Sequence, residues 1–191
     1  MIPRKIITLI DKDKLIDHMT KDMVGDDRRL RFGYHAKDEA VIKYLEQSLV
    51  LVGWNSMWFV VENGGRIIAT CHVAYDEKTQ CAELGFTVDP QYRGRGLGQL
   101  LFDRGSTWAN ARGAKELYMQ CLSENKVMQY IARKNAMTVI TMDSNEKEAS
   151  VTTSHNPMAA YVSDIFLDAL AMTDCAIRRM IRFSKPVSCA A

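Results

Sequence analysis

Residues 80–99 read Gln-Cys-Ala-Glu-Leu-Gly-Phe-Thr-Val-Asp-Pro-Gln-Tyr-Arg-Gly-Arg-Gly-Leu-Gly-Gln, and the rest of the chain is organised around them. Apolar and polar residues alternate up to Val88, as they do in a half-buried strand. A proline and a glycine-rich turn follow, and the apolar spacing of a helix begins inside the glycines. Strand, turn and helix in this order predict an anion-binding site.

The glycines of the turn indicate how the anion is held. Gly94, Gly96 and Gly98 allow positive φ angles, which direct the backbone N–H groups of residues 94–99 toward one position. The helix adds its unpaired first N–H groups and the positive end of its dipole, and two arginines of the turn add charge. The expected ligand is a phosphate or a pyrophosphate.

Two common nucleotide-binding motifs do not fit this turn. A P-loop needs Gly-Lys followed by Ser or Thr, whereas Gly98 is followed by Gln99. A Rossmann fingerprint needs Gly-x-Gly-x-x-Gly and an acidic residue at the end of the next strand, whereas residues 117–121 read Leu-Tyr-Met-Gln-Cys.

The turn fits the pattern Arg-x-x-Gly-x-Gly, from Arg93 to Gly98, after a strand that ends in Val-Asp-Pro. It resembles motif A of the GNAT superfamily, the acyl-CoA-dependent N-acetyltransferases. The resemblance implies that the loop holds the CoA pyrophosphate, and that strand 80–88 diverges from strand 115–122 and pairs its free edge with pantetheine. Backbone donors near the end of that strand would polarise the thioester carbonyl. The implied CoA contacts are Phe86, Thr87, Val88, Arg93, Gly94, Arg95, Gly96, Leu97, Gly98 and Gln99.

A second segment, residues 123–137, resembles the GNAT region in which an Asn begins a helix. The resemblance implies that Asn125 touches the pantetheine arm, with Met128 also on the CoA side. The Asn-x-x-Met spacing and the pair Ala82-Glu83 ahead of the loop are similar to the GNAT domains of bacterial protein-lysine acetyltransferases.

This segment departs from the family pattern at two places. Ala132 stands where many relatives carry a Tyr that protonates the leaving thiolate, and Tyr130 lies about 200° away around the helix. Ala136-Met137 replaces a Gly-Phe pair.

Glu83, a carboxylate in mid-strand, is the candidate general base. If residues 76–79 form the loop between strands 66–75 and 80–88, His72 lies directly across from Glu83 on the same face. Partial desolvation would raise the pKa of Glu83 toward neutrality, which suits removal of a proton from an amine. The alternative for Glu83 is an exposed strand charge. His72 either assists it or forms a polar pair with no kinetic role.

Composition limits the other classes of function. With 191 residues and 47% hydrophobic content, the chain can bury one core, so one domain is expected. A net charge of +2 without a polybasic segment argues against a nucleic-acid partner, and the four histidines lack metal spacing, so no metal is expected. Five cysteines without Cys-x-x-Cys spacing, no apolar signal core and no run of transmembrane length predict a cytoplasmic protein without a membrane partner.

Hydrophobic spacing predicts the elements. We expect strands at 4–10, 57–61, 66–75, 80–88, 115–122, 137–142 and 149–153, and helices at 11–23, 38–49, 97–113, 125–134 and 157–183. The segment with Arg28, Arg29 and Arg31 is expected to be a solvated turn rather than a site for an acidic substrate, and 144–147 a polar turn.

The predicted fold class is α+β and GNAT-like, with a central, mostly antiparallel mixed sheet of about seven strands and helices on both faces. Residues 1–155 are assigned to this domain and 156–191 to a C-terminal helical extension packed on it. The extension carries an apolar side, which we expect to pack on the domain; covering the substrate cleft, or pairing with a second chain in a homodimer, are alternatives. The residues of that side are Val162, Ile165, Phe166, Ala169, Leu170 and Thr173.

These patterns predict an acyl-CoA-dependent N-acyltransferase that moves an acetyl group from acetyl-CoA, its co-substrate, to a primary amine by direct attack, with Glu83 as base. The acceptor is a small amine or amino acid, or a lysine of a protein. The alternative is a non-catalytic sensor that binds acetyl-CoA.

Overall fold

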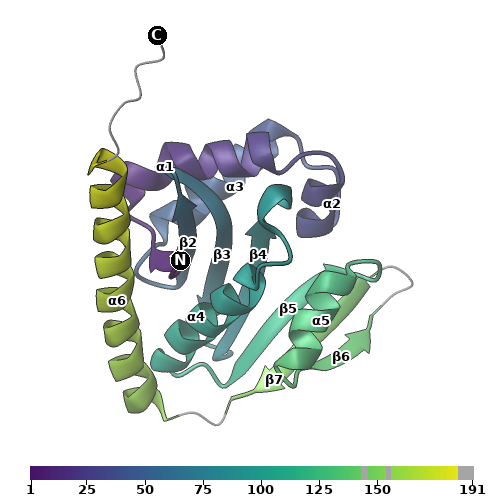
Figure 1. Ribbon diagram of the computed structural model, residues 1–191. Helices are drawn as coiled ribbons and strands as arrows, with labels where there is room; N and C mark the ends of the chain where they lie inside the picture. The colour runs from purple at the N-terminus through teal and green to yellow at the C-terminus, as the bar shows by residue number, and fades with distance from the viewer. Residues whose placement is uncertain (143–145, 154–155, 185–191) are drawn as a thin grey trace.

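A computed structural model describes residues 1–142, 146–153 and 156–184. Within them, seven strands form one sheet in the order β1-β2-β3-β4-β5-β7-β6 (Figure 1). Every neighbouring pair is antiparallel except β4 with β5, so the predicted mixed, mostly antiparallel sheet is confirmed. The strands are β1 Arg4–Lys5, β2 Ser56–Asn63, β3 Arg66–Asp76, β4 Cys81–Val88, β5 Glu116–Leu122, β6 Thr138–Thr141 and β7 Glu146–Thr152.

Helices cover both faces of this sheet, as predicted. One apolar core joins α4 and α5 to the sheet, and a second lies under α1 and α3 on the opposite face. The helices are α1 Thr8–Asp17, α2 Asp26–Phe32, α3 Asp38–Val50, α4 Leu97–Ala111, α5 Lys126–Lys134 and α6 Pro157–Ser184, with a π-helical turn at His18–Asp22 and a 3-10 turn at Pro90–Tyr92.

The first strand is shorter than the predicted 4–10. Strand β1 holds only Arg4 and Lys5, and α1 begins at Thr8. The buried carboxylate of Asp11 accepts a hydrogen bond from the backbone N–H of Ile7 at 2.8 Å and pairs with Arg4 at 2.6 Å. These contacts give polar groups at the start of the helix their hydrogen-bond partners. They therefore outweigh the strand preference of the β-branched residues.

The segment around residue 30 is a helix, so the prediction of a turn is wrong. Helix α2 starts after Gly25 and ends at Gly33, which take φ angles of 55° and 81°. Asp26 and Asp27 occupy its first turn, where carboxylates are favoured by the helix dipole. Short helices with polar faces are not visible to apolar periodicity, which is why the pattern missed this one.

The hairpin between β3 and β4 has a different register from the predicted one. Its loop is residues 77–80, because Gln80 takes a left-handed φ of 55° and does not join the strand. His72 therefore faces Gly85 and not Glu83. The shift is even, so His72 and Glu83 still share one face of the sheet.

Strands β4 and β5 diverge, as predicted. Only residues 81–83 of β4 pair with 116–118 of β5. Residues 84–88 continue along β3 but have no strand partner on the β5 side. This free backbone edge points into the gap between the two halves of the sheet.

The last two strands differ from prediction at their junction. Glu146 and Lys147, expected in a polar turn, are the first residues of β7 and pair with β5. The expected turn residues 144 and 145 lie outside the described residues.

Helix α6 packs along α4 (Figure 1), with its apolar side turned away from the domain. Val162, Ile165 and Phe166 are 61%, 52% and 62% exposed, whereas Ala160 and Asp164 are buried. The side turned inward is thus small or acidic.

An ion cluster explains this orientation of α6. Asp164 pairs with Arg104 of α4, and Lys5 of β1 donates to Asp164 at 2.8 Å and to Asp168 at 2.5 Å. Arg104 and the Asp164 side chain are almost fully buried. Turning the apolar side inward would leave buried Arg104 without a partner, which costs several kcal/mol.

Candidate active site

The glycine-rich loop after β4 presents backbone donors to one position. Gly94 and Gly96 take left-handed φ angles of 73° and 77°, and α4 begins at Leu97. The first hydrogen bond of α4 runs from the N–H of Leu100 to the carbonyl oxygen of Gly96. The N–H groups between these residues therefore have no partner within the helix and form an anion-binding helix start.

Gly98 does not take the positive φ that the sequence predicted, because it lies inside α4. A Cβ at this position would come within 2.8 Å of Cδ1 of Ile131 in α5. Gly98 therefore permits close packing of α4 on α5 rather than a turn.

Both arginines of the loop already have protein partners. Arg93 donates to the Asp27 carboxylate of α2 at 2.6 Å and to the carbonyl oxygen of Val88 at 3.2 Å. Arg95 donates to the carbonyl oxygen of Gln91 at 3.1 Å, with its guanidinium 4.9 Å from the ring centre of Tyr92. These contacts tie the loop to α2 and leave both guanidinium groups near the solvent.

The remaining predicted CoA contacts offer mostly backbone groups. Leu97 and Phe86 pack in the core, and Gln99 bonds to Asp103 and Asn135. Val88 and Thr87 lie on the free edge of β4. The side chains therefore fix the strand and the helix, and the backbone faces the gap.

Thr87 is held by a buried polar chain that the sequence did not indicate. Its hydroxyl lies 2.6 Å from that of Thr70 and 2.9 Å from Nε2 of His18, which is fully buried. Burial lowers the pKa of His18, although the carboxylate of Asp22 opposes the shift. A neutral His18 anchors the π-helical turn to β4.

Asn125 is the N-cap of α5. Its Oδ1 accepts a hydrogen bond from the N–H of Met128 at 3.1 Å, as capping asparagines do. Its side-chain NH₂ forms no hydrogen bond with the described residues. Ala132 is buried and Tyr130 is 64% exposed, so Tyr130 does not replace the Tyr that many relatives carry.

Glu83 is the last residue of β4 that pairs with β5, where it lies opposite Tyr118. Its side chain is exposed and forms no hydrogen bond or ion pair with the described part of the chain. The carboxylate stands at the point where the two strands diverge, next to the free edge of β4. A carboxylate in this position has free oxygen atoms that can accept a hydrogen bond or a proton.

His72 does not contact Glu83. Its Nδ1 lies 2.7 Å from the hydroxyl of Tyr44 and its Nε2 lies 2.8 Å from Oγ of Ser56, while the ring stacks on Trp58. Burial, reinforced by the nearby Arg31 cation, lowers the pKa of His72 to about 3. His72 is therefore a neutral structural group rather than a relay to Glu83.

The Tyr44 hydroxyl, which contacts His72, also contacts Arg31 of α2. Nη2 of Arg31 donates to it at 3.0 Å, and the guanidinium rests against Gly85 of β4. Sequence reasoning missed this contact, since α2 was not expected to be a helix. The glycine in mid-strand was the only local signal.

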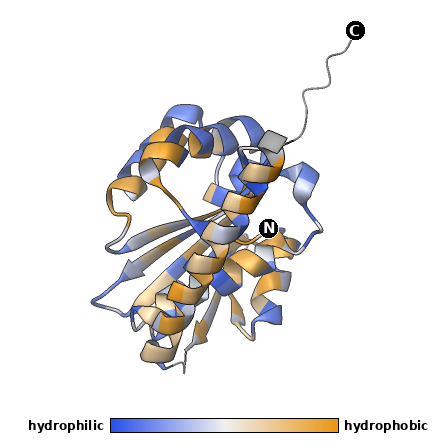
Figure 2. Ribbon diagram, turned by 60° about the vertical axis from the view of Figure 1, so that its left-hand side comes forward, coloured by the Kyte–Doolittle hydropathy of each residue, from blue (hydrophilic) through white to orange (hydrophobic). Residues whose placement is uncertain are grey.

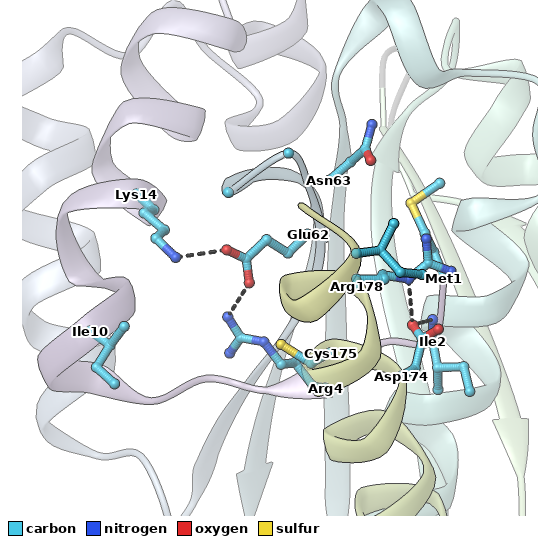
Figure 3. A pocket seen from close by; sticks show the side chains of 13 residues that line it. Met1, Ile2, Arg4, Ile10, Lys14, Glu62, Asn63, Asp174, Cys175 and Arg178 are labelled. Carbon is cyan, nitrogen blue, oxygen red and sulfur yellow. Dashed lines mark hydrogen bonds and ion pairs between the residues drawn. The ribbon is translucent and has the colours of Figure 1, made fainter. Parts of the chain in front are cut away.

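A cavity lies away from this site, at the β1 edge of the sheet (Figure 3). It measures about 790 Å³ and lies between α6, α1 and the β2–β3 hairpin. Arg4 and Lys14 point toward Glu62 there and form ion pairs with it. The charged groups of Arg4, Lys14 and Glu62 in this cavity are therefore engaged with one another.

The described residues contain no cluster of three or more His, Cys, Asp or Glu side chains that could hold a metal ion. No helix in this part of the chain is long and apolar enough to span a membrane.

Comparison with known proteins identifies the family. The family described as "Acetyltransferase (GNAT) family" matches residues 20–135, more than half of the chain. The chain belongs to the GNAT acetyltransferase family. No curated protein sequence matches this GNAT acetyltransferase significantly.

Solved structures share the fold. The GNAT domain of S. lividans PAT has a TM-score of 0.68 at 19% identity, covering 79% of this chain and 89% of that one. A ribosomal-protein-alanine N-acetyltransferase from Brucella melitensis gives 0.64 at 15%, covering 80% and 100%. RimL, a ribosomal L7/L12 alpha-N-protein acetyltransferase in complex with coenzyme A, gives 0.60 at 12%, covering 81% and 94%. At these identities, the likeness concerns the fold, and this GNAT acetyltransferase has the N-acetyltransferase architecture.

Proposed function

We propose that this GNAT acetyltransferase transfers an acetyl group from acetyl-CoA to a primary amine by direct attack, with Glu83 as general base. The observation that carries the proposal is the position of Glu83: an exposed carboxylate without a partner in the described structure, at the divergence of β4 and β5. The family and the free strand edge support it.

Different groups of the chain would bind different parts of acetyl-CoA. The N–H groups at the start of α4 bind the pyrophosphate, and the free edge of β4 over residues 84–88 pairs with pantetheine. Asn125 adds its unused NH₂ group at the other side of the gap. Backbone donors near Phe86 to Val88 stabilise the negative charge that develops on the thioester oxygen.

Proton movement then follows from Glu83. The carboxylate takes a proton from the incoming ammonium, the free nitrogen attacks the thioester carbon, and the C–N bond forms as the C–S bond breaks. As the amide forms, the nitrogen releases its second proton to solvent, and because Ala132 replaces the family's Tyr, the CoA thiolate takes its proton from solvent.

The acceptor class is proposed as an amine on a small molecule or amino acid, or a lysine of a protein. One of the similar structures is named as a ribosomal L7/L12 alpha-N-protein acetyltransferase and another as a ribosomal-protein-alanine N-acetyltransferase, which supports a primary amine as acceptor.

We also propose that two copies pair through α6. Ten large apolar side chains in the described part of this helix are exposed. On the same exposed side, a seam of four large apolar residues and two alanines recurs every three or four residues, as at the contact positions of a coiled coil. The seam residues are Met158, Val162, Ile165, Ala169, Met172 and Ala176.

The proposed reaction is tested with Glu83→Gln, which keeps size and loses basicity. Thiol release from acetyl-CoA is measured against pooled amines, amino acids and a lysine-bearing protein. Loss of general-base catalysis lowers kcat by about 100-fold or more while CoA binding by calorimetry is unchanged. Glu77→Gln, at an exposed loop carboxylate of the same hairpin, is the matched control.

Two outcomes would contradict the proposal. Equal rates for Glu83→Gln and the wild type remove Glu83 from catalysis. Tight CoA binding by a wild type whose thiol release no acceptor accelerates supports the alternative of a sensor.

A further inference from the structure

Arg31, near the end of α2, differs from the other arginines of this helix. Arg28 pairs with Asp38, and Arg29 pairs with Asp26 and Glu124. The half-buried guanidinium of Arg31 forms no ion pair with any carboxylate in the described residues. Its partners are uncharged: the Tyr44 hydroxyl at 3.0 Å and the rings of Phe32 and Tyr44, whose centres lie 5.3 and 5.8 Å away.

The groups around this cation do not neutralise it. Tyr44 is buried, and burial raises the pKa of its hydroxyl, so it stays protonated at neutral pH. The His72 ring behind it is neutral. Partial burial of a cation without a counter-charge is costly, and an anionic ligand that pairs with it would offset this cost.

The guanidinium lies against the candidate active site. A Cβ on Gly85 would come within 2.2 Å of Nη2 and 2.5 Å of Cζ of Arg31, so only glycine at this position lets the group rest on β4. Gly85 lies in residues 84–88 of β4, which do not pair with β5. Arg31 therefore faces the strand segment along which the acyl group is proposed to lie.

Glu83 stands two residues before Gly85 and shares its face of the sheet. The two positions are about 7 Å apart along the strand. An anion at one of these positions and an unpaired cation resting on the other complement a molecule that carries an ammonium and a carboxylate close together.

We propose that Arg31 binds a carboxylate of the substrate, beside the amine that Glu83 deprotonates. The planar guanidinium offers two parallel donors that match a carboxylate. The neighbouring Glu83 favours the acceptor as the source, an α-amino acid rather than a lysine within a protein. The same chemistry could come from a dicarboxylic acyl group on CoA. The inference rests on the proposed N-acyltransferase function.

The experiment compares matched pairs that differ by one carboxylate. In the acceptor arm, each amino acid is set against its own carboxamide with acetyl-CoA as donor. In the donor arm, succinyl-CoA is set against acetyl-CoA. Both arms are read by thiol release and by the rise in melting temperature on ligand binding. The melting temperature is measured with CoA-loaded protein for acceptors and with ligand-free protein for donors. This second readout reports binding even where no turnover occurs.

Arg31→Gln is compared with Arg29→Gln, which removes the same charge from the same helix. The wild type is expected to prefer the carboxylate member in one arm, and Arg31→Gln to lower that preference by about 10- to 100-fold. Arg31→Lys should retain part of it, and Arg29→Gln should leave it unchanged. The arm in which Arg31→Gln lowers the preference shows whether the carboxylate belongs to the acceptor or to the acyl group.

The proposal is overturned if the wild type treats both members of each pair alike, or if Arg31→Gln keeps the wild-type preference. Its failure is distinguishable from failure of the proposed function. A wild type that binds carboxylate ligands through Arg31 but never releases thiol contradicts the acetyl transfer alone. Turnover that is sensitive to Glu83→Gln but indifferent to Arg31→Gln contradicts only the carboxylate site.

Discussion

His72 shows how one residue couples the site to the stability of the fold. It is neutral, stacked on Trp58, and bonded at both ring nitrogens by Tyr44 and Ser56. Its folded pKa of about 3 lies below its ordinary value of 6.5. Between these values the unfolded chain binds a proton that the folded chain does not, so the free energy of unfolding falls as pH falls.

We therefore expect the wild type to lose about 2 kcal/mol through His72 between pH 6.5 and 5, as read by urea unfolding at several pH values. His18, whose pKa burial also lowers, adds a loss of the same sign. His72→Asn should be less stable at pH 7 but show a flatter pH dependence. His35→Asn, at an exposed histidine, should keep the wild-type slope. An unchanged slope in His72→Asn would contradict the assignment.

At the scale of elements, α6 is held by charge rather than by apolar burial. Arg104 of α4 is 2% exposed and pairs with Asp164 and Asp168 of α6. Burial would raise the pKa of Asp164, but hydrogen bonds from Lys5 and Arg104 hold it below its ordinary value. Removing one buried partner leaves the other charge without compensation.

Asp164→Asn is expected to lower the free energy of unfolding by about 3–5 kcal/mol, because buried Arg104 loses its buried counter-charge and keeps only the partly exposed Asp168. Asp168→Asn, at a carboxylate whose side chain is 32% exposed, should cost less than about 1 kcal/mol. Urea denaturation followed by circular dichroism measures both. Equal effects from the two substitutions would show that burial does not decide the strength of this cluster.

At the scale of the whole molecule, the consequence is an apolar helix face turned outward. Figure 2 brings α6 to the front and shows orange, apolar ribbon along much of it. If each of the ten exposed side chains covers on the order of 80 Å², the face offers on the order of 800 Å² per copy. This is about the area that each partner buries in a standard interface. A two-fold axis would pair the same seam with itself.

We expect the wild type to be a dimer at tens of micromolar in sedimentation experiments, and Ile165→Lys with Phe166→Glu to be a folded monomer. One charge then enters the seam at Ile165, and the other enters the exposed apolar face beside it at Phe166. Trp54→Lys is the control, since Trp54 is 80% exposed but lies outside α6. A monomeric wild type, or a dimer that survives the double substitution, would contradict pairing through this face.

Local features of the sequence determined much of this protein. The strand, glycine-rich turn and helix of residues 80–99 were predicted because glycine conformations and helix starts depend on neighbouring residues. The alternation that buries Ala82 and Leu84 also placed Glu83 on the opposite face, whatever the exact register. The resemblance to a segment in which an Asn begins a helix agrees with the N-cap at Asn125.

Contacts between distant segments decided the rest. The partner of Glu83 across the hairpin depended on one left-handed residue, Gln80, which no apolar pattern reveals. The approach of Arg31 to Gly85 joins residues more than fifty positions apart. The orientation of α6 is opposite to that predicted by its apolar side, because pairing of buried Arg104 outweighs burial of that side. Sequence patterns record what each segment prefers on its own, and only the tertiary structure shows which charges must be paired once the segments pack together.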